Sequence, residues 1–331
     1  MTALSPTLRE WVLKAQTPVW TGDADRKGEH TIPTGLLGSL RWWFEVVVRG
    51  LGGCACDPVN HPDNKPRPCP VEGKKPGEKG HHCAVCELFG CTDWARKFRF
   101  DVLDESGKIK RDQIKKDETF RFRFTPLRPM REEEWALLDL TLRLIADYGA
   151  IGGKTVLKPS EEASRQDLPH HRDYGIVQIE QAPPDACASE NALRKYLRDS
   201  VWRLVDHRQF AWASLENFWC VRERLLGRQS AANSAFNQVV GRKEPKQQGQ
   251  QLRPGANEAE SWLAGRQAKS KKVFSFKDPA RTFGFLKPDL LKLEDMRQRL
   301  KYVWQDLENE EFLRGPTILD RLLVEAMGGV R

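Results

Sequence analysis

Apolar side chains recur along the chain with two different periods. In the first 180 residues the pattern predicts, in order, a strand, a helix, two strands, a second helix and a last strand. These elements are expected at residues 11–20, 34–50, 96–103, 119–127, 131–148 and 173–179. The order β-α-β-β-α-β is that of a ferredoxin-like fold, and it predicts an α+β protein.

The pattern changes after residue 182. Pro183 and Pro184 mark a boundary, so we expect one domain over 1–182 and a second, helix-rich domain over 183–331. In the second domain we expect mostly helix over 189–226, a strand near 273–276, a turn at RTFGFLKP, and helices over 290–313 and 317–327.

Composition narrows the class of protein. The chain has 331 residues, 39% of them hydrophobic and 30% charged, which is typical of a soluble protein of one large or two ordinary domains. No apolar run reaches the roughly 18–20 residues that span a bilayer, and the N-terminus lacks the pattern of a secretory signal. These observations predict a cytoplasmic protein without membrane contact.

The positive charge is concentrated in one segment. Residues 241–287 hold eleven Lys and Arg against four Asp and Glu, which accounts for most of the net charge of +8. Its polar, glutamine-rich part, residues 241–272, is expected to be flexible. Such a patch favours a polyanionic partner, although a solvated basic linker remains the alternative.

Six of the eight cysteines lie within a Pro- and Gly-rich insertion at residues 52–91. In a cytosolic protein this clustering indicates metal ligation before disulfides, and the Cys-x-x-Cys pair has zinc-knuckle spacing. The predicted ligands are Cys56, Cys69, Cys83 and Cys86, with Cys54, His81 or His82 as substitutes. A zinc ion held by four sulfurs would be structural, because no position is left for a catalytic water. The alternative is a set of free thiols.

Three motifs carry a resemblance to a known family. They are IPTGLLGSLRWWFEVVVRGLGG, CAVCELFGCTDWARKFRF, and YGAIGGKT followed by HRDYGIV, with RTFGFLKP as a weaker C-terminal counterpart. In this order they resemble the RAMP superfamily, and within it the first subunits of the Cmr complex of type III-B CRISPR effectors. The three stronger motifs lie within residues 17–179.

The resemblance implies a ferredoxin-like core and no enzymatic role. We expect two such units, with the zinc loop inserted in the first. It also implies binding of the crRNA–target RNA duplex, in antiviral defence, together with other subunits of the effector complex. One rival is an endoribonuclease of the same superfamily that uses Asp23 or Asp25. A second rival is a zinc-bearing protein that binds DNA.

Candidate RNA contacts come from four parts of the chain. In the glycine-rich turn, backbone N–H groups are expected to approach phosphates, and the alternative for the turn is a plain helix C-cap. Trp42 is a candidate for base stacking or core packing, and Arg41 for RNA contact or an ion pair with Glu45. The full candidate set is Arg41, Trp42, Arg96, Lys97, Gly152, Gly153, Lys154, Thr155, Lys269, Lys271 and Lys272.

Overall fold

The structure is a computed structural model of the whole chain. It describes residues 7–22, 27–57, 68–153, 159–165, 168–169, 171–184, 186–205, 210–244, 252–265 and 270–327.

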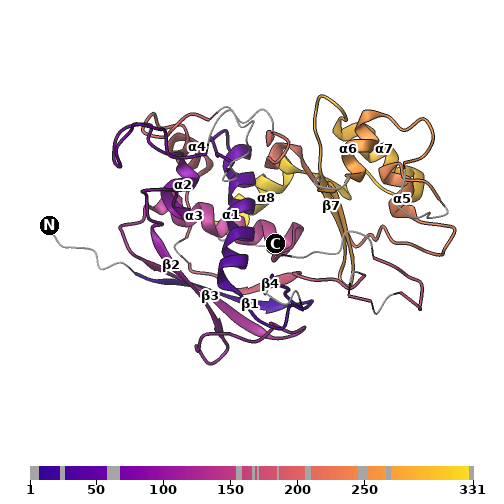
Figure 1. Cartoon of the computed structure of the whole chain (residues 1–331), viewed down its shortest axis with the longest axis horizontal. Coiled ribbons are helices and arrows are strands. Elements are labelled where there is room, and N and C mark those ends of the chain that lie inside the picture. Colours follow the sequence, from indigo (N-terminus) through magenta and orange to yellow (C-terminus); the bar gives the residue numbers. More distant parts are fainter. Residues whose placement is uncertain are drawn as a thin grey trace.

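The first half forms one four-stranded antiparallel sheet covered by two long helices (Figure 1). Its elements are β1 (Arg9–Ala15), α1 (Pro33–Gly50), α2 (Ala84–Phe89), β2 (Phe98–Asp104), β3 (Thr119–Pro126), α3 (Glu132–Tyr148) and β4 (Val177–Gln181). The strand order is β2-β3-β1-β4, and every neighbouring pair is antiparallel. The predicted ferredoxin-like order of the first half is therefore confirmed.

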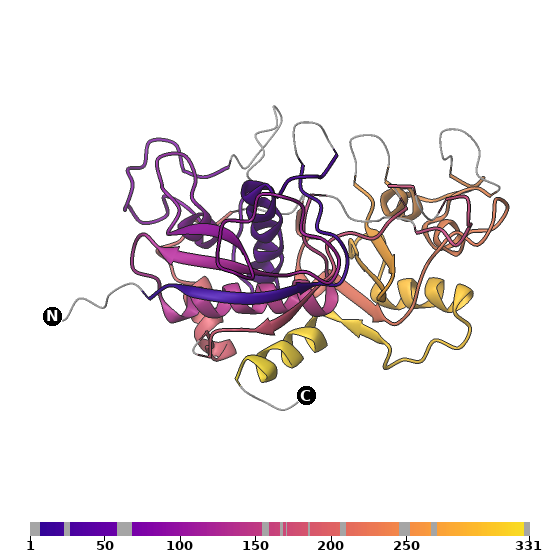
Figure 2. The same cartoon turned by 90° about the horizontal axis from the view of Figure 1, so that it is seen from below.

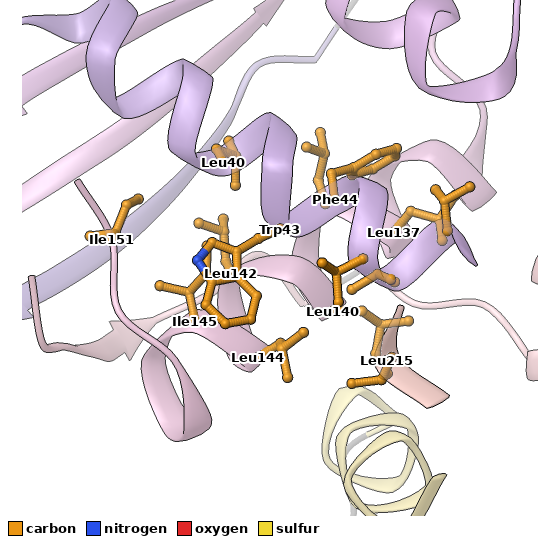
Figure 3. Close-up of a cluster of buried hydrophobic side chains, with 14 of the residues drawn as sticks. Leu40, Trp43, Phe44, Leu137, Leu140, Leu142, Leu144, Ile145, Ile151 and Leu215 are labelled. Carbon is orange, nitrogen blue, oxygen red and sulfur yellow. The ribbon is translucent and has the colours of Figure 1, made fainter. Parts of the chain in front are cut away.

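Alternation along the strands decides which face of the first sheet meets the helices. On β3, Phe120, Phe122 and Phe124 are fully buried, while Arg121 and Arg123 between them reach Glu10 on β1 at the other face. The buried row packs against α1 and α3, whose apolar side chains interleave in Figure 3. Because the period of a strand is two, a shift of one residue would bury the arginines instead.

A second βαββαβ unit follows. It contains β5 (Phe218–Arg222), α5 (Ala235–Val240), α6 (Glu258–Ala264), β6 (Val273–Lys277), β7 (Ala280–Phe285), α7 (Leu293–Val303) and β8 (Phe312–Arg314). Its strand order, β6-β7-β5-β8, repeats that of the first unit. The expectation of two ferredoxin-like units is confirmed.

The second sheet is buried on both faces, which corrects the sequence-based prediction. Phe218 and Cys220 of β5 join the core that contains α1 and α3, whereas Trp219 and Val221 join the core under α5, α6 and α7. Figure 1 shows the second sheet standing between these two sets of helices. A strand with two buried faces reads as a continuous apolar run, so the prediction of helix over 189–226 is wrong for β5. The same reason makes RTFGFLKP mostly strand β7, and not a turn.

Two helices of the second half pack back onto the first unit. The helix α4 (Glu190–Leu197) and the last helix, α8 (Gly315–Ala326), both contact α3 (Figure 2). The division after residue 182 therefore stays a prediction. Residues 290–313 were expected to be one helix, but the segment consists of α7 followed by strand β8.

The cysteine-rich insertion carries little regular structure. Among its described residues, α2 is the helix, and it begins directly after Cys83. In the described part of the chain, no helix combines the length and apolarity needed to cross a membrane.

Candidate metal centre and inter-unit pocket

Four cysteines from distant parts of the insertion meet at one buried point. The Sγ atoms of Cys56, Cys69, Cys83 and Cys86 all lie within 4.8 Å of one another, and all four residues are buried. A tetrahedral zinc site with Zn–S bonds of ~2.3 Å has sulfur–sulfur separations of roughly 3.8 Å. The cluster thus has the size of a metal site, and its members are the four predicted ligands.

The ionisation of these thiols also suits the binding of a cation. The pKa of Cys83 is held well below its usual value by hydrogen bonds from the other three thiols, chiefly from Cys56. The pKa values of Cys56, Cys69 and Cys86 are raised, because their sulfurs share those hydrogen bonds and are buried beside one another. One thiolate is thus favoured without a metal, while a divalent cation would stabilise all four.

Arg41 faces this cluster. Its Nη2 atom lies 3.3 Å from Cys86 Sγ and 4.0 Å from Cys56 Sγ, and Nη1 donates to Gly90 O at 3.0 Å. Its Nε atom donates to Glu45 at 3.1 Å. Burial lowers the pKa of Arg41, but the thiols and Glu45 outweigh burial and raise it above its usual value. The guanidinium is committed inside the protein, so the prediction of an RNA contact gives way to the alternative ion pair.

The substitute ligands named from the sequence lie elsewhere. His81 Nδ1 and His82 Nδ1 are 2.9 Å apart, and His82 Nε2 is 2.7 Å from Glu87 Oε2. Among the described residues, the metal-sized group contains neither histidine nor Cys54.

Lys97 is a buried residue, which corrects its prediction as a phosphate contact. Its Nζ atom lies 2.6 Å from Glu87 Oε1 and 2.7 Å from Glu134 Oε1, and its side chain is 8% exposed. The neighbouring Arg96 is half-buried and lies two residues before β2. A lysine held between two buried carboxylates has no free charge for RNA.

A pocket of about 340 Å³ opens between the two units. Its walls are aromatic and come from α1, from the segment before β5, and from β6 and β7: Trp42, Trp43, Trp212, Phe274, Phe283 and Phe285. Trp42 meets Trp43 and Phe285 edge to face, at centroid distances of 5.0 and 5.3 Å. Phe274 stacks on Phe283 at 5.1 Å.

Small residues form the rest of this inter-unit pocket. They are Gly35, Ser39, Ala150, Gly152, Gly153 and Ser270, and Lys271 is the cation among the lining residues.

The expectation that the glycine-rich turn offers free amides is wrong for two residues. Gly152 N donates to Ser39 Oγ at 3.1 Å, and Gly153 N donates to Trp20 O at 3.0 Å.

Gly152 has a backbone reason to be glycine. It has a φ of 116°, and a Cβ there would lie 2.7 Å from Trp20 O. The turn therefore packs tightly against Trp20, in the segment between β1 and α1, and lines the pocket beside it.

The lysines of the basic segment have different surroundings. Lys272 is buried, its ammonium lies 4.8 Å from the ring centroid of Trp212 and 5.0 Å from that of Trp262, and it donates to Ser270 O. This cage corrects its prediction as a phosphate contact. Lys271 lines the pocket, and its role as an RNA contact stays a prediction. Lys154, Thr155, Lys269, Asp23 and Asp25 lie outside the described residues.

Trp212, Phe274 and Ser39 are pocket residues that sequence reasoning did not select. Trp212 and Phe274 belong to the second unit, and their nearness to Trp42 is created by the packing of the second sheet against α1. The sequence offered one signal for this pocket, the aromatic residue Phe274 directly after the basic residues 241–272.

Comparison with known proteins finds a similarity to one superfamily in the first half of the chain. Residues 12–157 match the sequence model of the RAMP superfamily, a span that runs from β1 through the glycine-rich turn. Over this span the chain is similar to the RAMP superfamily, the family that its motifs resemble.

Solved structures give likenesses at low identity. Cmr1 from Pyrococcus furiosus, in its apo form, is 11% identical, with 90% of this chain and 97% of that one covered and a TM-score of 0.42. A chain of type III-B Cmr-beta bound to cognate target RNA and AMPPnP is 9% identical, with coverage of 89% and 99% and a TM-score of 0.42. A chain of the type III-A Csm3–Csm4 subcomplex is 14% identical, with coverage of 52% and 74% and a TM-score of 0.26. No curated protein matches the chain.

Proposed function

We propose that this protein is a non-catalytic, RNA-binding subunit of a type III-B CRISPR ribonucleoprotein. In this role it contacts the crRNA–target RNA duplex beside other subunits of the effector and serves antiviral defence. The proposal rests on the three RAMP motifs and on the match of residues 12–157 to the superfamily.

The inter-unit pocket is the observation that carries the RNA-binding part of the proposal. Its aromatic walls suit an unstacked base, because bases stack on aromatic side chains regardless of sequence. Lys271 supplies positive charge at the same place, next to the basic segment. A volume of about 340 Å³ lies at the small end of the range of ~300–1,000 Å³ that is typical of ligand sites.

The metal in this proposal is zinc, held by Cys56, Cys69, Cys83 and Cys86. Four thiolates match the preference of zinc and leave no open coordination position, so the metal organises the insertion and takes no part in chemistry. Arg41 offsets part of the negative charge of the thiolates.

Binding of fluorescent RNA tests the proposal. The full chain is titrated against a single-stranded RNA, an RNA duplex and a DNA duplex of the same sequence at one salt concentration. We expect RNA to bind more tightly than the DNA duplex. Tighter binding of the DNA duplex would contradict the proposal and favour the DNA-binding rival.

Trp42 offers a matched pair of variants for the same assay. Trp42→Leu keeps an apolar side chain but removes the aromatic face, and should weaken RNA binding by ~1–3 kcal/mol, whereas Trp42→Phe should retain most of it. Incubation of wild type with labelled target RNA tests the endonuclease rival. Cleavage that Asp23→Ala or Asp25→Ala abolishes would overturn the non-catalytic assignment.

A further inference from the structure

A second pocket, of about 530 Å³, lies in the second unit beside α5 and α7. Its lining differs from that of the inter-unit pocket, because it is polar and basic. Three of its residues are arginines, Arg242, Arg253 and Arg299, and they are joined by Gln238, Gln298 and Tyr302. The acidic side chain on the lining, Glu244, is engaged by Arg228 at 3.2 Å.

Arg242 is the unusual member of this arginine pocket. The residue is 8% exposed, and its Nη2 atom donates to Ala264 O at 2.5 Å. Its Nε and Nη1 atoms are buried and have no hydrogen-bond partner among the described residues. A buried donor without an acceptor is rare, and a buried guanidinium group without one costs more than a neutral donor.

The other two arginines, Arg253 and Arg299, are positioned by the carboxylate of Glu260. Both pair with Glu260, whose side chain is 2% exposed: Arg299 Nη1 lies 3.2 Å from Glu260 Oε1, and Arg253 donates to the same carboxylate. Glu260 is itself fixed, because it caps α6 through the backbone N–H of Asn257. One carboxylate therefore positions two guanidinium groups at the pocket and leaves an excess of positive charge.

We propose that this arginine pocket binds a phosphate group, with Arg242, Arg253 and Arg299 as its ligands. Phosphate offers several acceptor oxygens, and arginine is the side chain best suited to phosphate recognition. Burial lowers the pKa of Arg242, and a bound anion would oppose that effect. The proposal deepens the proposed function and rests on it where the phosphate belongs to an RNA backbone.

Two measurements on the full chain distinguish RNA phosphate from a free phosphate compound. The first is the salt dependence of single-stranded RNA binding, in which each neutralised phosphate adds a slope of about −0.7 to log K against log salt. The second is the shift in melting temperature caused by inorganic tripolyphosphate. Both are made on Arg242→Gln, Arg253→Gln and Arg299→Gln.

Arg297→Gln is the matched control. Arg297 lies two residues from Arg299 on α7, is similarly exposed (17% against 20%) and also pairs with a glutamate, Glu294. If Arg242→Gln fails to fold, Arg253→Gln carries the test, because the side chain of Arg253 is 54% exposed.

We expect the pocket variants to bind RNA roughly 10- to 100-fold more weakly, the range for one charge-assisted hydrogen bond, with a slope flatter by about 0.7. If RNA binding is unchanged but the stabilisation by tripolyphosphate is lost, the pocket binds a free phosphate compound. If the folded pocket variants match Arg297→Gln in both measurements, the pocket proposal is overturned. Failure of wild type to bind RNA would refute the proposed function, while the tripolyphosphate measurement would still decide the pocket.

Discussion

Lys97 ties the end of the cysteine-rich insertion to α3, and its removal should destabilise the first unit. The Lys97 ammonium lies 2.6 Å from Glu87 on α2 and 2.7 Å from Glu134 on α3. The Glu134 side chain is fully buried, and that of Glu87 is 10% exposed. Lys97→Met keeps the length of the side chain and removes its charge, so two buried carboxylates lose their shared cation.

The size of this loss of stability depends on the hydrogen bonds that Glu134 and Glu87 keep in the variant. Removal of one partner from a buried ion pair typically costs about 3–5 kcal/mol. Glu134 keeps hydrogen bonds from Tyr196 OH at 2.8 Å and from the Arg131 backbone N–H at 2.9 Å, and Glu87 keeps His82 at 2.7 Å. Because neither carboxylate is left without a donor, we expect the lower end of that range, about 3 kcal/mol.

Urea denaturation of the full chain, followed by circular dichroism, measures this loss. The double variant Lys97→Met with Glu134→Gln should recover part of it, because the neutral amide needs no cation. Its oxygen still accepts from Tyr196, while the hydrogen bond from the Arg131 N–H is lost. A Lys97→Met protein within ~0.5 kcal/mol of wild type would refute the buried network. If that protein also showed a flatter salt slope for RNA binding, Lys97 would be a phosphate contact after all.

Two further predictions concern the metal and the backbone. Metal analysis should find about one zinc per chain, and Cys83→Ser should release it and expose the insertion to proteolysis; protein purified without chelator, free of metal and with all eight thiols reactive, would contradict the zinc site. Gly315→Ala should destabilise the protein, because its Cβ would lie 1.5 Å from Leu215 O, whereas Gly38→Ala, in open space on α1, should stabilise it by about 0.5–1 kcal/mol. Thermal unfolding of the two variants measures whether each substitution raises or lowers the melting temperature, and equal melting temperatures would contradict the close packing at Gly315.

Local pattern was sufficient for the first unit. In β3, α1 and α3 the buried side chains lie mainly on one face. Apolar residues therefore recur with the period of a strand or of a helix, and the sequence pattern predicts the element. The clustering of the four cysteines was also predicted from the sequence, because the Pro- and Gly-rich part of the insertion has few apolar residues with which to form a core of its own.

The strands of the second unit could be assigned only from the tertiary structure. The strand β5 packs on α1 with one face and on its own helices with the other, so burial on both sides removed the alternation that marks a strand. The inter-unit pocket likewise exists only after the second sheet docks on α1 and brings Phe285 next to Trp42.

The surroundings of charged side chains were also known only from the tertiary structure. Composition counts Lys97, Lys272 and Arg41 as three positive charges available for RNA, yet each is held inside the protein by carboxylates, aromatic rings or thiols. Sequence records that a charge exists and how far it lies along the chain from others. Whether that charge faces water depends on residues brought next to it by folding, because electrostatic interactions act through space and not along the chain.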